Sequence, residues 1–245
     1  MISIFKREMR SYFTTSTGYI FLAVALSLSG ILFGVSTLTY MSSDTGTYFQ
    51  LMLFVLMIIL PILTMRTFSE ERRTKTEQLL LTAPISTFEM VMGKYLSCLC
   101  MFFIALMLTS VNYIPMFAAA ESGPLVSATA MGPNVALIIG NTIALLLVGM
   151  CFIAIGLFIS SLTENQFAAV VITIAILLGL LLVGLFNNII TWTPIRVVLE
   201  WLSIYRRYTA FTYGVFDFAS LIYYFSIAGV FVFLTMRVYD SRKYR

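Results

Sequence analysis

The chain has 245 residues, of which 60 % are hydrophobic and only 11 % are charged, and its net charge is +4. A soluble domain carries about half apolar and about a quarter charged residues, so this composition excludes an ordinary soluble protein. There is no His, and the three Cys residues lie inside apolar runs, which argues against a metal centre.

The apolar runs divide the chain into membrane-spanning segments. Each of six charge-free stretches supplies the roughly 20 apolar residues that a membrane helix needs, and none alternates like a barrel strand. We therefore predict an all-α integral membrane protein, a single domain over residues 1–245. Its six transmembrane helices are expected at about residues 18–40, 48–65, 95–117, 135–162, 167–186 and 221–238.

Residues 1–17 have the pattern of an interfacial elbow helix, with cations on one face and apolar side chains near the other. The cations are Lys6, Arg7 and Arg10, and the apolar residues are Ile2, Phe5, Met9, Tyr12 and Phe13. The alternative is a frayed basic tail that only sets the topology. In the first transmembrane helix, Gly30 and Gly34 form a GxxxG spacing that permits close helix approach, and we predict a permease dimer face there.

Residues 66–94 form a predicted cytoplasmic loop with nine charges. In hydrocarbon each charge would cost roughly 2.5–3.5 kcal/mol, so the loop lies outside the membrane. Thr67 or Ser69 is placed to cap a new helix whose first turn holds Glu70 and Glu71. An apolar run that includes Leu79 and Leu80 would end that helix. The alternative is a solvated loop that only fixes topology.

Residues 187–217 are too polar to span the membrane and too apolar for a free loop. Aromatic residues and arginines occur together there, which is typical of short re-entrant or interfacial helices at the outer surface. These residues are Trp192, Trp201, Tyr205, Tyr208 and Tyr213, with Arg196, Arg206 and Arg207.

The distribution of cations predicts the orientation. Twelve of the fifteen Lys and Arg residues precede the first predicted helix, lie between the second and third, or follow the sixth. The positive-inside rule places these segments, and both termini, in the cytoplasm. The basic charge is thus an orientation signal and gives no support for nucleic-acid binding.

The transmembrane stretches lack acids, bases and His, which argues against ion-coupled transport and intramembrane proteolysis. The pair Gly93-Lys94 is not a phosphate-binding loop, because Tyr95 follows it and Phe88 stands where the first Gly is required. We interpret Lys94 as a headgroup anchor where the third helix begins. We expect no catalysis, metal or cofactor in this chain.

Four patches resemble the type-2 ABC exporter permeases, and within them the small six-helix permeases related to gliding motility. They are residues 6–13 (KREMRSYF); 65–73 (MRTFSEERR) with 79–86 (LLLTAPIS) and 93–95 (GKY); 156–166 (GLFISSLTENQ); and 214–217 (GVFD). The second and third are the most specific, because charged residues recur there at fixed offsets from helix ends.

The resemblance implies a permease of the bacterial inner membrane. Two permease chains, identical or related, would pair within the lipid, and each would dock a separate cytoplasmic ABC ATPase that holds ATP and Mg²⁺. A cytoplasmic coupling helix between the second and third helices would make the contact. The implied coupling residues are Phe68, Glu70, Glu71, Arg72, Arg73, Glu77, Leu79 and Leu80. Lys75 and Gln78 depart from the pattern, where a Gly and an acid are usual.

Three functions remain open from the sequence. The first is the permease of an ATP-driven exporter. The second is a mechanical or scaffold subunit that passes ATP-driven motion to another protein without moving a substrate. The third, a secondary carrier or channel, is disfavoured by the charge-free helices. The sequence identifies no substrate.

Overall fold

The structure is a computed structural model that describes residues 1–39, 45–76, 86–115, 117, 134–186, 203–212, 214 and 217–243. All the elements assigned in these residues are helices, and six of them are long and apolar enough to cross a membrane. The prediction of an all-α chain with six candidate membrane spans is therefore confirmed.

The chain begins with α1 (Ile2–Thr14), which a sharp turn separates from α2 (Ser16–Phe33). Thr15 has an extended backbone (φ −97°, ψ 149°), which interrupts the helix between the two elements. A Cβ on Gly18 would collide with the carbonyl of Tyr12, so glycine permits this close turn. Helix α2 continues as a π-helical segment, η1 (Gly34–Thr39).

The next two helices extend into the expected loop at 66–94 and take up much of it. Helix α3 (Thr45–Arg73) does not end at residue 65 but continues through the charged sequence. Helix α5 (Thr87–Thr109) begins eight residues before residue 95, because the Ser86 hydroxyl caps it by accepting the amide of Glu89 at 3.2 Å. A 3-10 turn, η2 (Ser110–Asn112), follows α5.

The second half of the chain agrees more closely with the predicted bounds. Helix α7 (Val135–Leu162) coincides with the fourth predicted helix, and its first turn is capped by Asn134, which accepts the Ala136 amide at 2.9 Å. Helix α8 (Gln166–Phe186) follows a tight turn in which Asn165 accepts the Phe167 amide at 3.0 Å. The last elements are α10 (Ile204–Thr212) and α11 (Phe218–Lys243).

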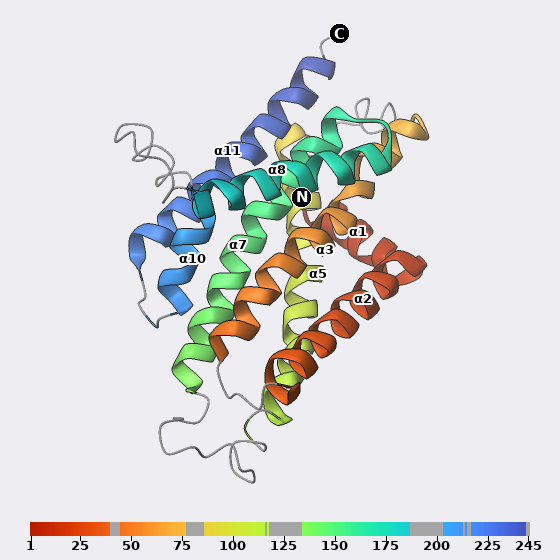
Figure 1. Ribbon diagram of the computed structural model, residues 1–245. Coiled ribbons are helices and arrows are strands. Elements are labelled where there is room, and N and C mark those ends of the chain that lie inside the picture. The colour runs from red at the N-terminus through yellow and green to blue at the C-terminus, as the bar shows by residue number, and fades with distance from the viewer. Residues whose placement is uncertain are drawn as a thin grey trace, which may run out of the picture.

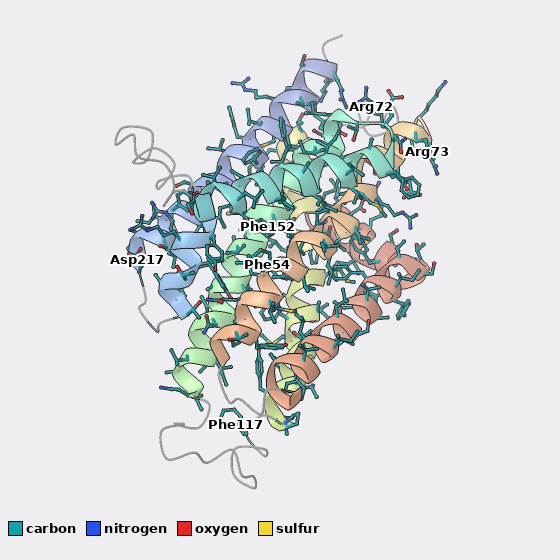
Figure 2. All side chains as sticks on the ribbon, viewed as in Figure 1. Phe54, Arg72, Arg73, Phe117, Phe152 and Asp217 are labelled. Atoms are coloured by element: carbon teal, nitrogen blue, oxygen red, sulfur yellow. The ribbon has the colours of Figure 1, made fainter. Side chains whose placement is uncertain are left out.

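Helix α7 is the centre of the bundle. It packs against α3, α5, α8, α10 and α11, and Figure 1 shows it between α3 on one side and α10 and α11 on the other. Phe152, near its middle, is fully buried (Figure 2). In contrast, α2, α8 and α11 leave most of their apolar surface uncovered, as expected of helices that face lipid.

Charged segments that are far apart in the sequence meet at one end of this bundle. Contacts join α1 to the end of α3 and the start of α5, and join the end of α11 to the end of α7. Figure 2 shows Arg72 and Arg73 at this end and Phe117 at the opposite end. We call α1 together with residues 66–76, 86–94 and 237–243 the charged end.

Several predictions fall partly or wholly outside the described residues. Of the outer segment 187–217, the structure describes α10, Ser203, Gly214 and Asp217, whereas Trp192, Arg196, Trp201 and Tyr213 lie outside the described part. Asn141 is buried in α7 and bonds within its own helix: its Nδ2 donates to Leu137 O, one turn back, at 2.9 Å.

Candidate functional site

The last two turns of α3 carry five charged side chains that do not break the helix. Arg66 donates from Nε and Nη2 to the two carboxylate oxygens of Glu70 at 2.7 and 2.8 Å. This bidentate pair spans one helical turn, the spacing at which opposite charges stabilise a helix. Both side chains are about one-third exposed (30 % and 33 %), so the pair remains accessible from outside.

A cluster of four charges joins α1, α3 and α5. Lys94 Nζ lies 2.7 Å from Glu71 Oε1 and 3.5 Å from Glu8 Oε1, and it also donates to Thr67 O at 2.7 Å. Arg7 Nη2 completes the cluster at 2.7 Å from Glu8 and 3.3 Å from Glu71. The Lys94 side chain is only 1 % exposed, so its charge depends on these partners for stabilisation.

The same cluster is reflected in the charge state of Arg7. Burial opposes the charged guanidinium, but the hydrogen bond to Glu8 and the charges of Glu8 and Glu71 raise the pKa of Arg7 overall. Arg7 therefore stays cationic, and each cation of the cluster faces both acids.

Aromatic rings extend the contact from α5 through α3 to α11. Lys94 Nζ lies 4.8 Å from the ring centroid of Phe68, which is fully buried. The Phe68 ring in turn packs on Tyr239 of α11 with centroids 4.9 Å apart. The Arg242 guanidinium lies 5.3 Å from the Tyr239 centroid.

A single hydroxyl of α7 binds the backbone of α3. Ser160 Oγ donates to Met65 O at 3.0 Å and accepts from the amides of Phe68 and Ser69 at 3.3 and 3.2 Å. One turn earlier, a Cβ on Gly156 would collide with Thr64, so glycine there allows the two helices to approach this closely. Residues 64–69 of α3 are thus held against α7 by packing and by hydrogen bonds.

The last carbonyls of α7 are bound by cations from two other helices. Arg72 of α3 donates to Leu162 O at 2.8 Å and pairs with Glu164 at 3.1 Å. Arg242 of α11 donates to Ser161 O at 2.7 Å. Cations stabilise the C-terminal end of a helix, where the backbone carbonyls lack partners.

Helix α1 is also held by a contact at its far end. Tyr12 Oη lies 3.3 Å from Cys98 Sγ of α5, and Thr67 Oγ1 of α3 lies 3.6 Å from the same sulfur. Burial raises the pKa of Tyr12 well above its ordinary value, so the phenol stays neutral and available for this hydrogen bond.

Five of the eight predicted coupling residues lie in α3. Phe68 is fully buried and Glu71 belongs to the buried cluster, whereas Glu70 is partly exposed and Arg73 is exposed. Arg72 faces the end of α7. The other three, Glu77, Leu79 and Leu80, lie outside the described residues.

The predicted helix start at Thr67 or Ser69 is wrong. Both residues lie within α3, and Ser69 Oγ donates to Met65 O one turn back in the same helix. The physical reason is that no Gly or Pro interrupts residues 62–76, and Arg and Glu are good helix formers. The helix ends instead at Arg73, and Lys75, two residues later, has a φ of 58° in the left-handed region that usually follows a helix and favours glycine.

The two glycines of the predicted dimer face have space beside them in the described part of the chain. A Cβ on Gly30 or Gly34 would meet nothing within 4 Å among those residues. The dimer face stays a prediction.

Sequence reasoning missed four residues of this site: Glu8, Lys94, Ser160 and Arg242. The sequence predicted Lys94 to be a headgroup anchor at the start of a helix, but it is buried two turns inside α5 and contacts both acids of the cluster. A signal was present, because Lys94 is the one Lys or Arg among residues 86–115 and Glu8 is the one acid among residues 1–39. Isolated opposite charges in apolar segments indicate a pair.

The fold and this site define a class of protein: a multi-pass helical membrane protein with one charged end at which α1, α3, α5, α7 and α11 are joined. The chain matches the family described as "ABC-2 family transporter protein" over residues 8–236, and it therefore belongs to that family. It is a membrane permease component of an ABC transporter. A comparison with curated proteins finds no match. The gliding-motility branch stays a prediction.

Proposed function

We propose that the chain forms the translocation pathway of an ATP-driven exporter, and that a separate cytoplasmic ATPase drives it through the charged end. The observation that carries this proposal is the continuity of α3. One helix includes both the apolar span and the charged residues 66–73, and those residues are bound to α1, α5 and α7. A displacement applied to the end of α3 would therefore move several helices together.

The exposure of the side chains suggests two different roles at the end of α3. Glu70 and Arg73 have surface available to a partner, so we assign them to ATPase contact. Phe68 is fully buried and Glu71 pairs with the buried Lys94, so we assign both to transmission of the motion within the permease. The predicted contacts of Glu77, Leu79 and Leu80 with the ATPase are part of the same proposal.

We further propose that the charged end faces the cytoplasm of a bacterial inner membrane, with both chain termini on that side. The excess of Lys and Arg in the segments that form this end supports the orientation. Two permease chains would pair in the lipid, and the open surface at Gly30 and Gly34 supports a close helix contact there.

The docking assignment is tested by changing exposed charges only. The double variant Glu70→Ala/Arg73→Ala should insert normally but lose most of the ATPase that co-purifies with the permease from its host. The matched control is Asp240→Ala/Lys243→Ala, which also removes one acid and one cation three residues apart at the charged end. Equal ATPase recovery with both double variants would refute docking at α3.

The second experiment separates export from transmission of force. In reconstituted vesicles, an exporter's ATPase activity should rise when its substrate is added, and the substrate should accumulate on the far side. Nucleotide-dependent motion of the permease with no accumulation of any candidate substrate would favour the mechanical function instead.

A further inference from the structure

A crevice of about 540 Å³ lies where α1, α2 and α3 meet. This volume falls within the roughly 300–1,000 Å³ of small-molecule sites. The lining changes character along its length, from charged residues at the charged end to aliphatic and aromatic residues farther along α2 and α3. Its charged part is shared with the cluster and with the Arg66–Glu70 pair, but neither the coupling contacts nor the predicted dimer face accounts for its apolar part.

The polar part of the crevice has charges of both signs and no net charge. Two guanidinium groups, Arg7 and Arg66, line it together with the carboxylates of Glu8, Glu70 and Glu71. The excess negative charge is balanced by Lys94, which does not line the crevice but lies 2.7 Å from Glu71. A headgroup with a single charge would therefore meet as many like charges as opposite ones.

The apolar part is continuous with the surface that faces lipid. Ile20 of α2 and Ile62 of α3 line it, and their side chains are 56 % and 37 % exposed. The buried side chains of Phe21 and Leu63 line it as well. An acyl chain could therefore lie between α2 and α3 without leaving the apolar environment, which favours a ligand with a tail.

We propose that this crevice binds a zwitterionic amphiphile of the phospholipid type. Its phosphate would face the guanidiniums of Arg7 and Arg66, its ammonium would face Glu70 and Glu71, and its tail would lie along Ile20 and Ile62. Bidentate guanidinium groups are well suited to phosphate. That such a lipid is also the class of substrate transported rests on the proposed function, whereas binding of the lipid in the crevice does not.

Binding is measured on the purified permease alone, without any ATPase, so that its failure leaves the coupling proposal intact. Phospholipids with identical nitroxide-labelled chains and different headgroups are added in detergent, and the immobilised fraction is read by electron paramagnetic resonance. Phosphatidylethanolamine should be retained more than anionic phosphatidylglycerol. Equal retention of the two lipids would overturn the proposal.

The location is tested by filling the apolar part. Ile62→Trp should reduce the immobilised phosphatidylethanolamine severalfold. The matched control Ile176→Trp, at a side chain of α8 with the same 37 % exposure, should leave it unchanged. Equal effects of the two tryptophans would place the bound lipid elsewhere.

The charge argument makes a further prediction of opposite sign for two neighbouring residues. Glu70→Gln leaves the crevice one charge more positive and should raise phosphatidylglycerol binding about fivefold, since one charge near a membrane surface is worth about a factor of five. Arg66→Gln should lower it. Parallel changes in both variants would show that the pair only supports the fold and does not select the headgroup.

Discussion

Replacing Lys94 by Met tests whether the buried charge cluster holds the charged end together. Met keeps the length and the apolar stem of the side chain but removes the ammonium. Glu71 and Glu8 then lose a partner, and their side chains are only 20 % and 15 % exposed. Removing one partner of a buried pair typically costs about 3–5 kcal/mol, because the remaining charge is left uncompensated.

The cost should fall near the low end of this range, since Arg7 still lies 3.3 Å from Glu71. About 3 kcal/mol corresponds to a fall in melting temperature of roughly 6–12 °C for a chain of this size. The assay is thermal unfolding of the purified permease in detergent. The control is Arg10→Met, which removes an exposed cation from α1 and should change the melting temperature little.

A double variant distinguishes the charge pair from simple loss of packing. If Lys94→Met destabilises because Glu71 is left unpaired, adding Glu71→Gln should recover about 1 kcal/mol or more, a coupling typical of groups in direct contact. The reasoning would be refuted if Lys94→Met were as stable as the parent chain, or if the effects of the two substitutions simply added.

Three further substitutions test single contacts. Ser160→Ala removes the hydroxyl that binds three backbone groups of α3 and should cost about 1–3 kcal/mol in thermal unfolding, unlike Ser226→Ala, whose exposed hydroxyl bonds only its own helix. Lys75→Gly should raise the melting temperature, because an L-residue at positive φ costs about 1–2 kcal/mol, whereas Lys75→Ala should not. Asp217 caps α11 and its hydrogen bond from Ser220 lowers its pKa, so its contribution is complete above the ordinary carboxyl pKa and is lost as pH falls through the lowered value. The Asp217→Ala variant should therefore lack this decrease in stability at acid pH when its stability is measured against pH.

The spans were predictable because hydrophobic length alone determines them, and helix ends were predictable where turn residues mark them. Helix α7 has its predicted bounds, with Asn134 capping its start and Asn165 in the turn that follows its end. The structure extends α3 beyond both predicted ends, begins α5 earlier than predicted and continues α11 beyond its predicted end. Charge marks where a segment leaves the hydrocarbon, but a helix ends only where its backbone hydrogen bonding ends.

The membership of the buried cluster was not predictable in full because its residues come from three helices. The isolation of Lys94 and Glu8 indicates that each needs a partner, but the two residues and Glu71 are separated by 23 to 86 positions, and the sequence does not say which charges meet. Ser160 is similar, since a serine near the end of an apolar helix usually bonds its own helix. Such contacts depend on how helices cross, which the periodicity of each helix alone does not specify.

The length of α3 bears directly on how a push would be transmitted. At 1.5 Å per residue its 29 residues span about 43 Å, whereas the hydrocarbon core is only about 30 Å thick. The surplus of about 13 Å is close to the length of residues 66–73, so the charged turns form the part of the same rod that extends beyond the hydrocarbon. A separate docking helix would pass motion to the bundle only through a loop. Because α3 is one helix through Pro61 and is bonded to α7 at Ser160, rotation of its charged end would reach the membrane span without an intervening loop. Inserting a flexible Gly-Gly pair between Arg66 and Thr67 should therefore uncouple ATPase activity from permease motion.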